Sequence, residues 1–324
     1  MKVTFSIDHW ALNAGFATSQ ETLFNIETLT VYLDADGISA RGEALGVDYF
    51  GETAQSISHQ VMDIVGDLEG GLDRAGLQSL LPPGGARNAV DCALWDLACK
   101  RRGARAWELA GVSANPVTTL YTLSLDAAET MAREAHAQHA HAVLKLKLDD
   151  QGVAERVKAV RAARPDARLL IDANGAWDAA LLERVGDTLA RCEIDLLEQP
   201  LPRDGDDALA GLNYPVPLCA DESCQHAGEV EALRGRYDVI NIKLDKTGGL
   251  TEALALVQEA RDLGFELMVG NMLGTSLAMA PAFLVAQDCR WVDLDGPLWQ
   301  RADRAYPIRY DGGAMSPPEA KLWG

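Results

Sequence analysis

The chain has 324 residues, of which 48% are hydrophobic, and a net charge of −19 at pH 7. This acidity argues against nucleic acids and anionic membranes as partners, because phosphate binding needs clustered Lys and Arg. No apolar run is long enough for a transmembrane helix, and Asp8 and His9 interrupt the N-terminus before it could act as a signal peptide. The six cysteines form no C-x-x-C pair, which predicts reduced thiols in a cytoplasmic protein.

The first hundred residues have the pattern of an α+β lobe. Residues 22–33 and 38–44 are strand-like, and Asp36-Gly37 between them is a turn signal. Residues 53–69 and 86–101 carry apolar side chains at helical spacing. The lobe should therefore combine a hairpin-like sheet with at least two helices.

From about residue 116 the pattern becomes a repeat of short apolar runs separated by helical segments. A series of eight right-handed βαβ units closes into a (β/α)₈ barrel. An open doubly wound sheet is the alternative, but it would leave two edge strands. The runs are 117–123, 143–148, 169–172, 194–198, 216–220, 239–244, 266–270 and 291–295.

Polar residues end most of these runs, where a barrel enzyme carries its chemistry. The steps from Lys147 to Asp172, Glu198, Asp221 and Lys243 are 25, 26, 23 and 22 residues. One step per strand of nearly equal length places these five side chains at similar heights on one rim. A single Asp or Glu at a strand end is usually a helix cap or a solvated charge. Three carboxylates in register repel one another unless a cation such as Mg²⁺ lies between them.

Two lysines of the second run have a defined direction. Lys145 and Lys147 are two residues apart and so point to the same side of a strand, and the residues of opposite parity are Leu144, Leu146 and Leu148. In a barrel the leucines must face the helices, so the lysines face the interior. Lys243 follows the same rule between apolar neighbours. An exposed strand of an antiparallel sheet has the same alternation, but a barrel strand has no solvent face. We expect desolvation and a nearby cation to lower the pKa values of these lysines.

Motifs along essentially the whole chain resemble the enolase superfamily, specifically the subgroup of muconate cycloisomerases and dipeptide epimerases. The match in type, order and spacing makes the resemblance specific. The motifs are ARNAVDCALWDLA (86–98), KLKLD (145–149), IDAN (171–174), LEQPLP (197–202), ADES (220–223), NIKLDKTGGL (241–250) and DLDGP (293–297).

The resemblance implies a TIM-like α/β barrel of the modified β/α7β type with an N-terminal α+β capping domain. Residues 1–114 would form the capping domain, 115–300 the barrel, and 301–324 a C-terminal segment that returns to the cap. A homo-oligomer is compatible with the sequence.

The resemblance also implies roles for the rim residues. One Mg²⁺ per subunit would be held by Asp172, Glu198 and Asp221. The paired acid and base would be Lys147 and Lys243. Lys145 would help to hold the substrate carboxylate, while Asn174 and Glu222 would support the metal ligands without binding the ion.

The pair Asp293 and Asp295 indicates which activity of this subgroup the chain has. Both carboxylates point to one side of the last strand, and in dipeptide epimerases a similar pair binds the α-ammonium group of the substrate. The turn sequence Asp295-Gly296-Pro297 offers a simpler explanation. The resemblance therefore predicts epimerisation of a dipeptide at the α-carbon of its C-terminal residue, by two-base 1,1-proton transfer through an enediolate. N-acylamino-acid racemase, o-succinylbenzoate synthase and cycloisomerase activities remain alternatives.

The second residue of the dipeptide would be read by the cap loop near residues 18–24, with Gln20 and Glu21 as substrate-binding residues. Family members that act on Ala-Glu tend to carry an arginine in this loop. Here no Lys or Arg occurs between Lys2 and Arg41. We therefore expect a hydrophobic or cationic second residue rather than an acidic one, unless a cation such as Arg301 reaches the site from elsewhere.

Overall fold

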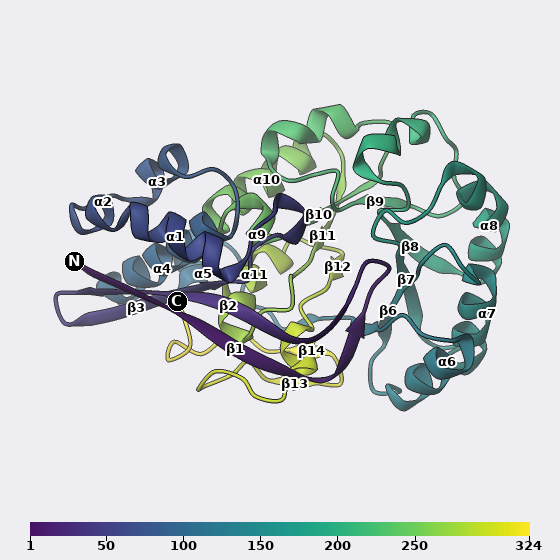
Figure 1. The fold of residues 1–324 in the computed structure, drawn as a ribbon, viewed down its shortest axis with the longest axis horizontal. Coiled ribbons are helices and arrows are strands. Elements are labelled where there is room, and N and C mark those ends of the chain that lie inside the picture. Colours follow the sequence, from purple (N-terminus) through teal and green to yellow (C-terminus); the bar gives the residue numbers. More distant parts are fainter.

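The computed structural model describes residues 1–324 as an N-terminal lobe and a larger barrel (Figure 1). The lobe contains an antiparallel sheet of order β1-β2-β3. Its strands are β1 (Lys2–Ala17), β2 (Thr22–Ala35) and β3 (Ile38–Ala44). Asp36 and Gly37 have φ values of 55° and 78°, the positive values that the two-residue turn between β2 and β3 requires. The predicted hairpin is confirmed by the pairing of β2 with β3.

Strand β1 is a long element that was not predicted from the sequence. Only Val3, Leu12 and Phe16 among its 16 residues are fully buried. The first part of the strand nevertheless carries the two-residue alternation of a half-buried strand, because Val3, Phe5 and Ile7 pack on the lobe core and alternate with polar residues. Its pairing with β2 holds it in place, although the register shifts between Ala11 and Phe16.

Helix α4 joins the cores of the lobe and the barrel. One side of this helix, with Ala89 and Ala93, belongs to the apolar core of the lobe, whereas Cys92 and Trp95 belong to the large core of the barrel. The predicted helix over 53–69 is divided into α1 and α2 at Ile64. The helices are η1 (Asp48–Phe50), α1 (Ala54–Asp63), α2 (Val65–Glu69), α3 (Arg74–Leu80), α4 (Gly85–Arg102) and α5 (Ala106–Ala110).

Eight parallel strands form the barrel, which confirms the predicted fold class. The two edge strands, β12 and β5, meet through a hydrogen bond of 2.9 Å from Leu120 N to Val292 O. In sheet order the strands are β12 (Trp291–Val292), β11 (Glu266–Val269), β10 (Val239–Ile242), β9 (Leu218–Ala220), β8 (Ile194–Glu198), β7 (Arg168–Asp172), β6 (Val143–Lys147) and β5 (Tyr121–Leu123).

The prediction of one barrel strand over 117–123 is wrong in one respect, because this stretch forms two strands in different sheets. Val117–Thr118 (β4) pairs with Ala314–Met315 (β14) of the C-terminal segment, and only Tyr121–Leu123 enters the barrel. β14 in turn pairs with Tyr310–Asp311 (β13). The apolar run continues through both strands, so its pattern could not reveal the change of sheet.

Helical segments lie outside the barrel and cover its strands (Figure 1). Two connections, from β8 to β9 and from β9 to β10, contain only 3₁₀ turns, η2 (Arg203–Leu209) and η3 (Ala227–Leu233). None of the helices has the length and apolar character needed to cross a membrane. The other helical segments of the barrel are α6 (Ala128–Ala137), α7 (Val153–Ala163), α8 (Ala179–Arg191), α9 (Leu244–Thr247), α10 (Leu250–Asp262), α11 (Ser276–Ala286) and η4 (Gly296–Trp299).

The barrel interior changes from apolar to charged along the strands. Its lower part is a cluster of eight buried side chains, one from each strand or the residue just before it: Leu120, Val143, Leu170, Leu196, Cys219, Val239, Met268 and Trp291. Above this layer, Lys145, Asp172 and Glu198 occupy the interior, whereas Leu144 and Leu146 pack outward in the barrel core. The predicted parity of this strand is confirmed.

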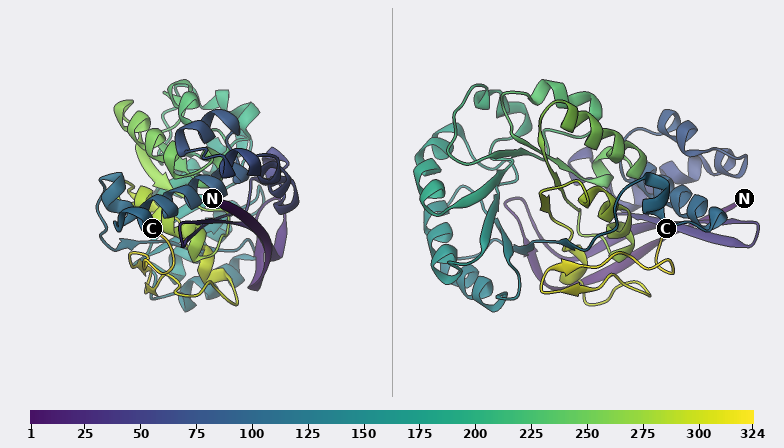
Figure 2. Two further views of the ribbon diagram at one scale, coloured as in Figure 1. Left: turned by 90° about the vertical axis from the view of Figure 1, so that its left-hand side faces the viewer. Right: turned by 180° about the vertical axis from the view of Figure 1, so that it is seen from behind.

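The C-terminal residues lie against the lobe, and both chain ends are found there (Figure 2). The indole Nε1 of Trp323 donates to Cys92 O at 3.0 Å, and Gly324 N donates to Asp96 Oδ1 at 2.8 Å. Arg41 of β3 donates to Leu322 O at 3.1 Å. These bonds connect the end of the chain to α4 and β3.

A buried ion pair joins the lobe, the barrel and the C-terminal segment. Glu43 of β3 accepts hydrogen bonds from Thr275 N and Oγ1, both at 2.8 Å, at the start of α11. Arg304 Nε donates to the same carboxylate at 2.9 Å. The guanidinium group also contacts Asp8 Oδ2 at 2.7 Å and Thr30 Oγ1 at 2.6 Å. Glu43 has no other cation beside it.

We expect Arg304→Met to destabilise the protein by about 3–5 kcal/mol, because it leaves the fully buried Glu43 carboxylate without its counter-charge. Urea unfolding of the purified protein measures this loss. Arg301→Met is the control, since this arginine is exposed and donates only to Leu12 O. Equal losses in the two variants would contradict the prediction.

Candidate active site

The two lysines predicted as acid and base lie on opposite sides of the barrel. Lys147 ends β6 and Lys243 directly follows β10, and these strands are four places apart in the eight-stranded order. Both side chains are nearly buried, with 7% and 6% exposed, and both line one cavity at the carboxyl ends of the strands. A molecule in this cavity therefore lies between two amines.

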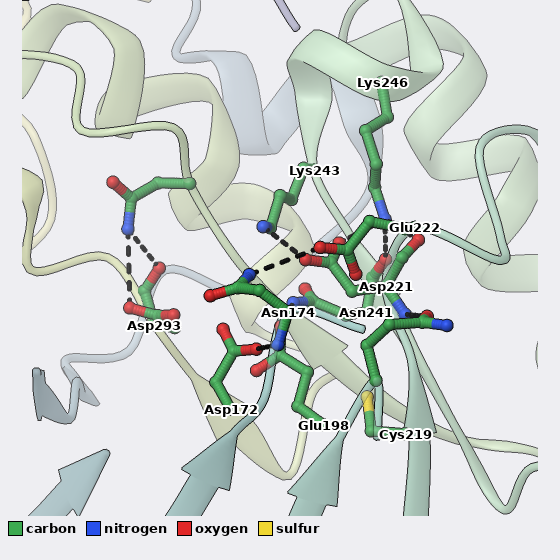
Figure 3. A network of polar contacts seen from close by, with 12 residues as sticks. Asp172, Asn174, Glu198, Cys219, Asp221, Glu222, Asn241, Lys243, Lys246 and Asp293 are labelled. Atoms are coloured by element: carbon green, nitrogen blue, oxygen red, sulfur yellow. Dashed lines mark hydrogen bonds and ion pairs between the residues drawn. The ribbon is translucent and has the colours of Figure 1, made fainter. Parts of the chain in front are cut away.

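Three buried carboxylates occupy the strands between these lysines. Asp172 and Glu198 are paired in register on β7 and β8, and Asp221 follows β9. Lys147 Nζ lies 2.7 Å from Asp172 Oδ2, and Lys243 Nζ lies 2.6 Å from Asp221 Oδ2. Lys145 Nζ bridges Asp172 at 2.9 Å and Glu198 at 2.7 Å. Figure 3 shows the carboxylates converging below Lys243.

The carboxylates are paired with ammonium groups in this arrangement. No three His, Cys, Asp or Glu side chains are gathered closely enough to hold a metal ion as they stand. Glu198 Oε2 nevertheless makes no hydrogen bond, although it contacts the Lys145 ammonium, and Glu222 Oε2 has no partner. The site thus contains oxygen atoms whose bonding capacity is unused.

Burial and crowding of negative charge shift the pKa values of this cluster. The pKa of Glu198 is raised by its burial and by the charge of Asp172, and that of Glu222 is raised to about 7 by burial and Asp221. For Lys243, burial alone would lower the pKa, but Asp221 and Glu198 outweigh it and raise the pKa above its ordinary range. The lowered pKa expected from the sequence is therefore wrong for both Lys145 and Lys243 in this arrangement, because carboxylates are paired directly with each amine and raise its pKa.

Asn174 and Glu222 lie beside the cluster, as their positions in the sequence suggested. Asn174 Oδ1 accepts from Lys147 Nζ at 2.9 Å, and its backbone N donates to Asp172 Oδ1 at 2.9 Å. Its Nδ2 donates to Glu222 Oε1 at 3.2 Å (Figure 3). Asn174 thereby connects a lysine to the carboxylates of Asp172, which ends β7, and Glu222, which follows β9.

Asp293 and Asp295 line the same cavity from the last strand of the barrel. Asp293 Oδ2 accepts from Lys145 Nζ at 2.7 Å, while Asp295 Oδ2 accepts from Thr122 N at 2.7 Å. Burial and the charge of Asp293 raise the pKa of Asp295 to about 7. Asp295 also precedes the 3₁₀ turn η4, so it occupies a turn and faces the cavity at once.

Loops of the lobe cover the cavity. Gln20 and Glu21 line it, together with Asp48 and Tyr49 of a second loop. Gln20 Nε2 donates to Asn174 O at 3.3 Å, so the first loop lies against the barrel rim. No arginine is among the lining residues.

Three buried residues of the site were not assigned a role from the sequence. Lys246 Nζ donates to Asp221 Oδ1 at 2.7 Å and to Asn241 O at 2.9 Å, and Asn241 Nδ2 donates to Glu198 Oε1 at 2.7 Å. Gln199 Oε1 accepts from Asp221 N. Asn241 has the same strand parity as Lys243, a signal that could have identified it. Lys246 lies on the short helix α9, where strand parity does not apply.

Comparison with known families agrees with this geometry. Residues 1–111 match the N-terminal domain of the mandelate racemase and muconate lactonizing enzymes, and residues 127–321 match the enolase C-terminal domain-like family. The chain belongs to the enolase superfamily, in its mandelate racemase and muconate lactonizing enzyme branch. The resemblance seen in the sequence is confirmed.

Within this family the chain is similar to dipeptide epimerases. It is 42% identical to the L-Ala-D/L-Glu epimerase of Escherichia coli K12, over 94% of this chain and 96% of that protein. It is 43% identical to an N-acetyl-D-glutamate racemase of Pseudoalteromonas over 76% and 79% of the two chains. These two relatives act on different derivatives of glutamate.

Two solved structures share the fold. An enolase family member from Agrobacterium tumefaciens with homology to dipeptide epimerases contains sodium and L-Ala-L-Glu, and it matches with a TM-score of 0.98 at 42% identity over 99% of both chains. A dipeptide epimerase from Enterococcus faecalis complexed with Mg and L-Leu-L-Tyr matches with a TM-score of 0.89 at 26% identity, over 98% of this chain and 97% of that one.

Proposed function

We propose that this enzyme, a dipeptide epimerase like its relatives, inverts the α-carbon of the C-terminal residue by moving a proton between Lys147 and Lys243. The observation that carries the proposal is the placement of these two amines on opposite sides of one buried cavity. Inversion needs a base on one face of the α-carbon and an acid on the other. The 42% identity to an L-Ala-D/L-Glu epimerase over nearly the whole chain supports the same class of substrate.

We further propose that Asp172, Glu198 and Asp221 hold one Mg²⁺. Carboxylate oxygens from three adjacent strands are the donors that Mg²⁺ prefers. Glu198 Oε2 makes no hydrogen bond, and an ion bound to it would take the place of the Lys145 ammonium that lies 2.7 Å away. With every group ionised, the carboxylates at the rim outnumber the ammonium groups by two. The six carboxylates are those of Asp172, Glu198, Asp221, Glu222, Asp293 and Asp295, and the four ammonium groups are those of Lys145, Lys147, Lys243 and Lys246. When bound, the ion supplies positive charge beside the substrate carboxylate, where negative charge develops during proton removal.

The other side chains bind and orient the dipeptide. Lys145, which contacts Glu198 and Asp293 at 2.7 Å, lies where it can hold the substrate carboxylate. Asp293 and Asp295, which line the cavity just after β12, accept the α-ammonium group. These contacts hold the α-carbon between Lys147 and Lys243, and the lysine that faces the α-hydrogen acts as the base.

Lys147→Ala and Lys243→Ala should each lower the rate of epimerisation by at least about 10³-fold, because each removes the acid or the base of the reaction. Each variant should still exchange with D₂O the α-hydrogen of the stereoisomer that faces its remaining lysine. Mass spectrometry of dipeptides incubated in D₂O measures both effects, and EDTA should abolish exchange in the wild type. Lys158→Ala, on the exposed side of α7, is the control. Epimerisation in either active-site variant at the wild-type rate would rule out the two-base scheme.

The second residue of the dipeptide is proposed to be hydrophobic or cationic. Glu21 and Asp48 line the cavity from the lobe, and the only cations that line it are the three lysines already committed to the reaction and the substrate carboxylate. Arg301, the alternative cation, donates to Leu12 O and does not line the cavity. An acidic second side chain would therefore meet like charge.

The relatives favour a second candidate, a dipeptide with glutamate at its second position. A library of L,L-dipeptides with alanine first, assayed by deuterium uptake, separates the two. We expect Ala-Leu, Ala-Phe or Ala-Lys to exceed Ala-Glu by at least tenfold in kcat/KM. N-acetylated amino acids in the same library test the racemase activity of the second relative. A preference for Ala-Glu would overturn the proposed second residue while leaving the epimerase mechanism in place.

The raised pKa of Asp295 predicts a pH dependence of substrate binding. A carboxyl group with a pKa of about 7 is ionised above that pH, and only the ionised form attracts the substrate ammonium. As pH falls from 7.5 to 6, we expect kcat/KM to fall about eightfold through protonation of this group. The pH profile of Asp295→Asn should lack this step, whereas Asp311→Asn, at the exposed end of β13, should keep it. An identical step in the Asp295→Asn profile would assign the titration to another group.

A further inference from the structure

Asp221 is the one proposed metal ligand that lies outside a strand. Asp172 and Glu198 are the last residues of β7 and β8, where the sheet holds their backbone. Strand β9 ends one residue before Asp221, at Ala220. The direction of the Asp221 carboxylate therefore depends on contacts other than the strand ladder.

The side chain of Gln199 replaces the missing ladder contact. Gln199 Oε1 accepts from Asp221 N at 3.0 Å and from Ser223 N at 3.1 Å. Two converging N–H donors fix the orientation of the amide, because only its oxygen can accept them. Gln199 is fully buried and has φ of 36°, a left-handed conformation that is uncommon for a residue with a side chain. This backbone strain has to be offset by the contacts that the side chain makes.

The nitrogen end of the amide is held by a chain of polar groups that reaches the surface. Gln199 Nε2 lies 2.7 Å from Ser223 Oγ and 3.0 Å from the Tyr237 hydroxyl. Tyr237 in turn donates to Asp206 Oδ2 at 3.0 Å, and Asp206 pairs with Arg236 at 2.7 Å. Asp206 lies in η2, the 3₁₀ segment that replaces a helix between β8 and β9.

We infer that Gln199 is a positioning residue for Asp221, and that Tyr237 and Asp206 lock the Gln199 amide in the orientation that this role needs. The inference rests on the proposed function, since it takes Asp221 as a metal ligand. Outer hydrogen bonds of this kind orient a ligand and typically change metal affinity by about 10–100-fold. A role limited to folding would instead change stability and leave the affinity of the folded protein for Mg²⁺ unaltered.

The test is titration of the full-length, metal-free protein with Mg²⁺ by calorimetry, in the absence of dipeptide. Gln199→Met should raise the Kd for Mg²⁺ by about 10–100-fold. Tyr237→Phe should raise it by about threefold to tenfold, because it removes one of the groups that hold the amide nitrogen and leaves Ser223 Oγ and Leu201 O in place. Tyr214→Phe is the matched control. Its hydroxyl donates to Leu182 O at 2.9 Å, a bond with no connection to Asp221.

Thermal unfolding of the metal-free proteins separates the two roles. We expect Tyr237→Phe and Tyr214→Phe to lower the Tm by similar amounts, with a weaker Kd for Mg²⁺ only in Tyr237→Phe. If Gln199→Met does not fold, the comparison of the two tyrosine variants still decides. Equal Kd values in wild type and Tyr237→Phe would overturn the inference and leave the proposed function intact. Absence of Mg²⁺ binding by the wild type would overturn the proposed metal site itself.

Discussion

The constraint on which this structure depends is the confinement of many charges in the upper half of a barrel that water scarcely enters. Lys145, Asp172, Glu198 and Asp221 are all at most 1% exposed. A buried charge without a partner costs several kcal/mol, so each group must lie against an opposite charge. The amine of Lys145 accordingly contacts three carboxylates, those of Asp172, Glu198 and Asp293. The apolar layer below closes the other end of the barrel, so the charged groups can be reached only from the side that the lobe covers.

The attachment of the lobe follows from the same constraint. The lobe lies over buried charges, so it has to be attached firmly to the barrel. The polar groups that it buries in doing so also need hydrogen-bond partners. One side of helix α4 packs in the apolar core of the lobe and the other in that of the barrel. Glu43 of the lobe accepts hydrogen bonds from Thr275, at the start of α11, and from Arg304 of the C-terminal segment. The loop with Gln20 is held against the barrel rim by long side-chain hydrogen bonds. Ser19 Oγ donates to Ala173 O and Gln20 Nε2 donates to Asn174 O, both at 3.3 Å. The body of the lobe is thus fixed, whereas the loop proposed to meet the substrate is held weakly.

Much of the fold and of the arrangement of the rim could be predicted from the sequence, because strands impose a period of two. Alternation with Leu144 and Leu146 determined that Lys145 and Lys147 face inward, and regular spacing placed Asp172 and Glu198 in register. The rule fails outside strands, so Lys246 and the contacts of Gln199 could not be predicted. The same period is present in Val3, Phe5 and Ile7 of β1, where it was overlooked. It fails where one apolar run serves two sheets, as in 117–123. The raised pKa of Lys243 depends on distances of about 3 Å or less, which no sequence pattern contains.

The division between barrel and lobe also explains how relatives with similar sites can differ in substrate. Every dipeptide has an α-carbon at its C-terminal residue, a carboxylate and an α-ammonium group. The side chains proposed to act on these shared parts all lie on barrel strands or just after them. In the proposed binding mode the second side chain meets loops of the lobe, including Glu21 and Asp48, which carry none of those side chains. A change in these loops can therefore alter the preferred second residue while the proton-transfer geometry is unchanged. For this reason, 42% identity to an enzyme that acts on L-Ala-D/L-Glu supports the reaction more strongly than it supports glutamate as the second residue.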